Sequence, residues 1–82
     1  MKLLLNVYIP AISEKYDILI PGTLKIKSAV SMIATTVETL SNHLYISSGR
    51  ESLCSVEKSI TLRPNATLEQ YGIQNGDHLV MI

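Results

Sequence analysis

Apolar and polar residues alternate along the start of the chain, and this pattern predicts a pair of β-strands. From Lys2 to Ile9 (KLLLNVYI) one face carries only apolar side chains, as in a half-buried strand. Pro10 ends the segment, and a second alternating segment runs from Tyr16 to Pro21. Because the connection between them is short, we expect the two strands to form an antiparallel hairpin.

The hydrophobic period changes after Pro21 and predicts one amphipathic helix from about Lys25 to Leu40. The apolar stripe consists of Ile26, Ala29, Val30, Ile33, Val37 and Leu40. The last two turns are rich in threonine, a weak helix former, so tertiary packing must hold them. Asn42 is a candidate for the left-handed residue that ends the helix.

The middle of the chain predicts further short strands. Residues from His43 to Ser47 (HLYIS) alternate, and we expect Leu44 and Ile46 to face inward while Tyr45 faces out. After the Ser48-Gly49 turn the pattern weakens. Two shorter strands are expected, at Leu53-Cys54 and at residues 60–62.

The C-terminal segment combines a capped turn, a tight corner and a closing strand. Thr67 and Gln70 have the spacing of a capping box, and Tyr71 and Ile73 are expected to anchor the turn inward. Asn75-Gly76 can supply the positive φ of a tight corner. The last strand is expected from His78 to Ile82, with Leu79 and Met81 facing inward.

These elements predict one domain, residues 1–82, with the helix covering one face of a mixed sheet of four or five strands. A single amphipathic helix is the only element that can bury the apolar stripes of both the helix and the sheet. We expect the first strand to lie between the second and the last, and the last to pair with the third.

Two short motifs resemble ubiquitin-like proteins. Residues 67–74 (TLEQYGIQ) resemble the TLSDYNIQ stretch of ubiquitin, and residues 71–79 (YGIQNGDHL) resemble the YukD/EsaB group of bacterial ubiquitin-like proteins. The segment from Arg50 to Pro64 departs from ubiquitin's shorter loop. The resemblance implies an α+β, ubiquitin-like β-grasp fold. It also implies a cytoplasmic accessory of a type VII secretion system, whose protein partner would be a cytoplasmic domain of a membrane component.

The residues at the C-terminus differ from those of ubiquitin-like proteins that are covalently attached to other proteins. Ubiquitin and the sulfur carriers end in a flexible Gly-Gly tail, since their carboxylate must reach an activating enzyme. Here residues 79–82 contain no glycine, and Gly76 lies in the predicted corner. We therefore expect a non-conjugated adaptor. A C-terminally activated modifier or sulfur carrier is the disfavoured alternative.

Composition narrows the chemistry further. The chain is 46% hydrophobic, which can supply a core, and its formal net charge of zero argues against nucleic-acid binding. A single cysteine, Cys54, excludes an internal disulfide and a cysteine-based zinc site. No apolar run is long enough to insert in a membrane, so we expect a cytoplasmic protein.

No catalytic motif occurs, so we expect a protein that is not an enzyme and needs no cofactor or metal. One alternative uses His43 and His78, which would lie near each other if they began neighbouring strands. They could then form a small metal site, or one of them a pair with Cys54.

The most informative feature is a set of apolar side chains that alternation directs away from the helix. The set consists of Leu4, Tyr8, Leu19, Tyr45, Val80 and Ile82. A contiguous exposed apolar patch commonly marks a partner site, so we expect a protein-binding surface here. The same face could also bind a second copy of the chain, giving a homo-oligomer.

Overall fold

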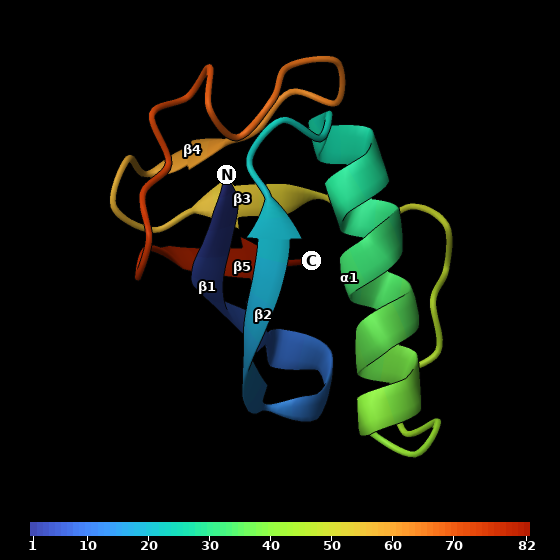
Figure 1. Cartoon of the computed structure of the whole chain (residues 1–82). Coiled ribbons are helices and arrows are strands. Elements are labelled where there is room, and N and C mark those ends of the chain that lie inside the picture. Colours follow the sequence, from blue (N-terminus) through green and yellow to red (C-terminus); the bar gives the residue numbers. More distant parts are fainter.

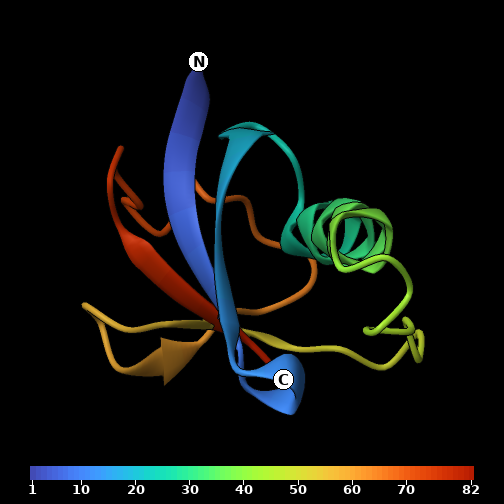
Figure 2. The same cartoon turned by 90° about the horizontal axis from the view of Figure 1, so that it is seen from below.

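The computed structural model describes all 82 residues. Five strands form one mixed sheet in the order β2-β1-β5-β3-β4, and one α-helix lies against one of its faces (Figures 1 and 2). The elements in chain order are β1 (Lys2–Ile9), the 3₁₀ helix η1 (Pro10–Ile12), β2 (Glu14–Pro21), α1 (Ile26–Leu40), β3 (Leu53–Ser55), β4 (Ile60–Thr61) and β5 (His78–Met81). This arrangement confirms the expected α+β class.

The central strand β1 joins the two halves of the sheet. It pairs with β2 along its whole length in antiparallel fashion and with β5 in parallel fashion. β5 in turn pairs with β3 in antiparallel fashion, as expected for the last and third strands. Parallel strands need a long crossover, and the chain between β1 and β5 provides it by passing through α1.

The core lies between α1 and the inner face of the sheet. α1 buries four residues of the predicted stripe together with Ala34: Ile26, Ala29, Ile33 and Val37. Val30 is only partly buried, and Leu40, in the last turn of the helix, is 58% exposed. Alternate residues of the strands meet that face, and Leu5, Val7, Ile9, Leu53 and Leu79 are completely buried. Leu68 and Ile73, from the segment before β5, close the same cluster.

The predicted strand at residues 43–47 is wrong. α1 ends in a tight turn in which Asn42 and His43 both have positive φ, and the N–H of His43 donates to the carbonyl of Glu38 at 2.8 Å. Leu44 and Ile46, expected to face inward, are each 71% exposed. The strand that fills the third position is β3, further along the chain. Two consecutive left-handed residues turn the backbone away from the sheet before any pairing can begin.

The C-terminal segment forms as its turn chemistry predicts. The N–H of Thr67 donates to Oε1 of Gln70 at 2.9 Å, and the N–H of Gln70 donates to Oγ1 of Thr67 at 3.1 Å. Gly76 has a φ of 88°, and its N–H donates to the carbonyl of Leu4 at 2.7 Å. Asn75 Oδ1 accepts from the N–H of Leu4 at 2.7 Å, so this corner extends the β1 pairing ahead of β5.

Candidate functional site

The face of the sheet turned away from α1, here called the outer face, carries the first of two apolar clusters on the β1–β2 hairpin. Leu4 and Leu19 are direct cross-strand partners, so their side chains lie side by side on this face. Leu4 is 46% exposed and Leu19 is 52% exposed. This pair is therefore apolar surface that no element of the chain covers.

The second cluster surrounds a shallow hollow on the same face. Tyr8 and Val80 are partners across the parallel β1–β5 pair, and both are half-buried. Val56, which is 52% exposed, completes the cluster. The three line a hollow of about 430 Å³, and its rim includes Lys15, whose Nζ lies 6.0 Å from the centroid of the Tyr8 ring.

A polar strip separates the two clusters. Asn6 Nδ2 donates to Asp17 Oδ1 at 3.1 Å. Next to Asn6 on β5, the N–H of His78 donates to Glu57 Oε1 at 2.9 Å, and its ring Nδ1 lies 2.6 Å from Glu57 Oε2. These hydrogen bonds from His78 lower the pKa of Glu57. The outer face thus combines apolar anchors with fixed polar groups, as partner surfaces do.

The structure brings five of the six expected residues to the outer face and places the sixth elsewhere. Ile82 is 71% exposed and lies beyond Val80, opposite Ser52. Tyr45 is not on the sheet, because the segment that carries it turns at the end of α1. Its hydroxyl donates to Glu51 Oε2 at 2.6 Å, and its ring packs against the core. Its expected place on the outer face is therefore wrong.

The apolar set expected from the sequence did not include Val56, which lies in the turn directly after β3. Its place follows from alternation: Cys54 is the partner of Val80, so Val56, two residues on, points to the same face. The sequence predicts a strand at Leu53-Cys54, but the direction of Val56 follows only once Cys54 is known to pair with Val80.

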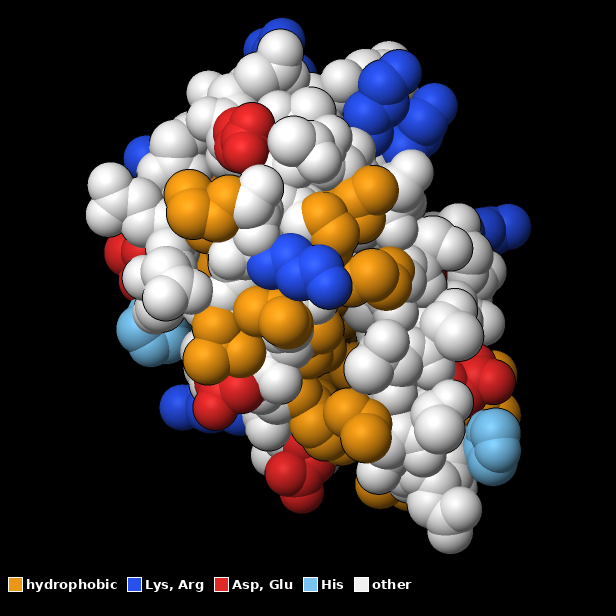
Figure 3. Space-filling view, in the orientation of Figure 1, with side chains coloured by type: hydrophobic (Ala, Val, Ile, Leu, Met, Phe, Trp, Pro, Cys, Tyr) orange, Lys and Arg blue, Asp and Glu red, His pale blue; other side chains and the backbone are white.

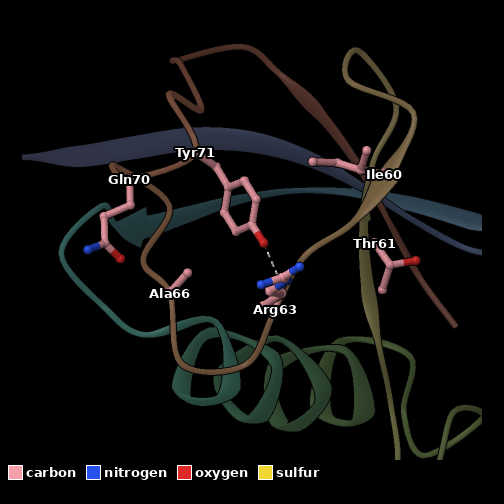
Figure 4. Close-up of a pocket in the computed structure, with 6 residues that line it drawn as sticks. All are labelled: Ile60, Thr61, Arg63, Ala66, Gln70 and Tyr71. Carbon is pink, nitrogen blue, oxygen red and sulfur yellow. Dashed lines mark hydrogen bonds between the residues drawn. The ribbon is translucent and has the colours of Figure 1, made fainter.

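A second hollow lies beside β4, at the far edge of the sheet (Figure 4). Its volume is about 540 Å³, and it is lined by Ile60, Thr61, Arg63, Ala66, Gln70 and Tyr71. The Tyr71 ring stands over it, and the Tyr71 hydroxyl accepts a hydrogen bond from the N–H of Arg63 at 2.9 Å (Figure 4). Its lining has no acidic, cysteine or histidine side chain, so it offers binding chemistry and no proton-transfer pair.

The histidines and the cysteine do not form one site. His43 lies 3.8 Å from Glu38 at the end of α1, whereas His78 contacts Glu57 at the start of β5. Cys54 Sγ lies 3.6 Å from Thr61 Oγ1. The structure holds no group of three or more His, Cys, Asp or Glu side chains placed to bind a metal ion. It also has no helix with both the length and the apolar character needed to cross a bilayer.

Solved structures share the fold at low identity. A ubiquitin-like domain of EccD5 from Mycobacterium xenopi matches with a TM-score of 0.81 at 19% identity, covering 100% of this chain and 93% of that one. A ubiquitin-like domain from Arabidopsis thaliana matches at 0.75 and 22%, covering 99% and 76%. Ubiquitin from Caldiarchaeum subterraneum matches at 0.72 and 16%, covering 100% and 92%. These likenesses confirm the ubiquitin-like fold.

A search of curated proteins found no match to the chain. The family model of the protein YukD, from the WXG100 protein secretion system (Wss), matches residues 4–81. The match spans nearly the whole chain, including both strands of the opening hairpin, the helix and the closing corner. The chain therefore belongs to the YukD family and is a ubiquitin-like module associated with type VII secretion.

Proposed function

We propose that this chain is a cytoplasmic, non-conjugated adaptor that binds a protein partner of the type VII secretion system through its outer face. The observation that carries the proposal is the uncovered apolar surface made by Leu4, Leu19 and Val56. Small soluble domains seldom leave neighbouring large apolar side chains uncovered without a use for them. A cytoplasmic segment of a membrane component of the same system is the partner that fits the family.

The two clusters suggest how the partner would bind. An apolar side chain of the partner would enter the hollow between Tyr8, Val56 and Val80, while a second would cover Leu4 and Leu19. Completing the burial of a half-exposed Leu or Val contributes about 1 kcal/mol. The Asn6–Asp17 and His78–Glu57 groups between the clusters would give selectivity, because a partner that left them unpaired would lose affinity.

The alternative role is that of a C-terminally activated modifier or sulfur carrier. In the structure the N–H of Ile82 donates to the carbonyl of Ser52 at 2.9 Å, and the N–H of Ser52 donates to the carbonyl of Ile82 at 2.8 Å. The alternative is tested with ATP and a ubiquitin-type activating enzyme, and an adenylate formed at the C-terminus would refute the non-conjugated role.

The docking proposal is tested with two matched double variants. Leu19→Asp with Val56→Asp alters the outer face, at side chains that are each 52% exposed. Leu44→Asp with Ile46→Asp introduces the same charges at side chains that are each 71% exposed, on the loop after α1. Both variants should melt within a few degrees of the wild type, because none of these side chains is in the core.

Binding is measured by interferometry against purified cytoplasmic segments of type VII secretion membrane proteins from the same organism. We expect the outer-face variant to weaken binding at least tenfold, about 1.4 kcal/mol, and the loop variant to bind as the wild type does. Equal binding by both variants, or a loss confined to the loop variant, would refute the outer face as the docking surface.

A further inference from the structure

The strand β2 forms one edge of the sheet, and part of its backbone has no partner. The N–H of Gly22 donates to the carbonyl of Met1, which fixes the alternation of hydrogen-bonded pairs along the hairpin. By that alternation Tyr16, Ile18 and Ile20 bond to β1. On β1, Leu4 and Asn6 turn instead to the other side, where they bond Gly76 and Asp77.

The N–H and C=O groups that remain on β2 belong to Lys15, Asp17 and Leu19, and they point away from the sheet. An edge of this kind is a template for another strand. Pro21 and the charged side chains at the edge limit which strand can pair there. Any partner must therefore satisfy both the backbone groups and the charges.

An apolar seam runs beside this edge, between β2 and α1. Ile12, Tyr16, Leu24 and Met32 are only partly buried against the core. Lys27, Val30 and Ser31 line a hollow with β3 on one flank of α1, so the helical period places Met32 on the opposite flank, towards β2. Figure 3 shows hydrophobic side chains gathered over β2 and along this seam.

We propose that the occupant of this edge is a second copy of the chain, with two β2 strands paired antiparallel about a two-fold axis at Tyr16. In this register Lys15 of each copy lies opposite Asp17 of the other, on the outer face, and these residues exchange the backbone hydrogen bonds. Tyr16 meets its own copy on the α1 side, where an aromatic pair is favourable. The result is one ten-stranded sheet.

Charge complementarity selects this register over its neighbours. Shifting the two-fold axis to Asp17 places Asp17 against Asp17, which like-charge repulsion disfavours. Shifting it to Ile18 places Asp17 against Leu19 and leaves the carboxylate without a cationic partner. A strand from an unrelated protein would have no reason to match the alternating charges of Lys15 and Asp17. The inference does not depend on the proposed adaptor role.

Sedimentation equilibrium on the full chain tests the proposal by charge reversal. Lys15 and Asp17 are both exposed, so their substitution should leave the fold intact. We expect Lys15→Asp and Asp17→Lys each to weaken dimerisation at least tenfold, because each places like charges opposite one another. The swapped variant with both changes, and an equimolar mixture of the two single variants, should both restore dimers. Lys27→Asp, on the other flank of α1, is the matched control and should dimerise as the wild type does.

Amide hydrogen exchange gives a second reading of the register. Raising the protein concentration should slow exchange at Lys15 and Asp17 and leave Leu19 fast, because Leu19 lies beyond the paired residues. A wild type that stays monomeric to millimolar concentration would overturn the proposal. So would single variants that dimerise normally, or protection that also covers Leu19. Binding of only an extended peptide from another protein at this edge, without self-association, would overturn it as well.

Discussion

The Tyr45–Glu51 contact holds the long segment between α1 and β3 and allows a sharp test. Glu51 accepts hydrogen bonds from the Tyr45 hydroxyl at 2.6 Å, from the N–H of Ser48 at 2.8 Å and from Ser47 Oγ at 3.5 Å. Burial alone would raise the pKa of Glu51, but these bonds outweigh it and lower that pKa to about 2. Burial and the bond to Glu51 raise the pKa of Tyr45 to about 12.

The pKa of Glu51 gives the size of the stability loss expected when the Tyr45 hydroxyl is removed. A fall from 4.5 to about 2 corresponds to about 3 kcal/mol of preference for the charged form in the folded state. Several donors share this preference, and solvent around the loop reduces it. The share of the Tyr45 hydroxyl is therefore about 1 kcal/mol, somewhat less than the roughly 1.5–3 kcal/mol of a well-buried hydrogen bond to a charged group. Tyr45→Phe should lower the free energy of unfolding by that amount at pH 7, since the ring still packs.

The stabilisation by Glu51 should be lost as the pH falls. The folded-state pKa of Glu51 is depressed, so its contribution is present above the unfolded pKa near 4.5 and is lost as the pH falls towards 2. The difference in unfolding free energy between wild type and Tyr45→Phe should hold from pH 7 to about pH 5 and then shrink as Glu51 protonates.

Urea denaturation at pH 7, 4 and 2 measures this difference, with Glu51→Gln and the double variant completing a thermodynamic cycle. Tyr8→Phe is the control, because the Tyr8 hydroxyl makes no hydrogen bond to the protein, and it should change stability little at any pH. A Tyr45→Phe effect that persists at pH 2, or that is equally large in the Glu51→Gln background, would show that the hydroxyl does not act through Glu51.

Two core and turn predictions accompany this one. Gly76→Ala should cost about 1 kcal/mol of stability in urea denaturation, because Gly76 has a φ of 88° and a Cβ there meets no atom within 4 Å, so the cost is purely conformational. A change below about 0.3 kcal/mol would contradict that reading of the corner. Leu68→Ala should cost about 3 kcal/mol, since Leu68 is 0% exposed and packs into the main core. A loss below about 1 kcal/mol would mean that the capped turn detaches easily.

The elements that the sequence predicts well are those with a long, unbroken period. β1 begins and ends where alternation places it, and α1 begins one residue from its expected start. The capping box and the Asn75-Gly76 corner also form, because their chemistry is local and needs no distant partner. In these segments local preference and tertiary packing agree.

The strand predicted from His43 to Ser47 is wrong because the pattern there is short and local preference does not decide the structure. Five alternating residues fit a strand, yet they fit an exposed loop equally well when side chains at the end of α1 accept hydrogen bonds from its backbone N–H groups. Glu38 Oε1 accepts from the N–H of Ser47 at 2.9 Å, and Ser41 Oγ accepts from the N–H of Tyr45 at 3.0 Å. These contacts join parts of the chain whose approach alternation cannot reveal. The misplacement of Tyr45 follows from this wrong assignment of the third strand.

The outer face and the β2 edge are separate surfaces that meet at Lys15. The Lys15 side chain lies on the rim of the outer-face hollow, whereas its N–H and C=O groups belong to the edge. In a dimer the Lys15 ammonium would be drawn from the Tyr8 ring towards Asp17 of the other copy, because an opposite charge attracts it more strongly than a ring 6.0 Å away. Pairing would therefore uncover one side of the hollow and bring two outer faces onto one continuous sheet. A partner with two binding segments would then bind both copies, and its affinity would gain from the link between them.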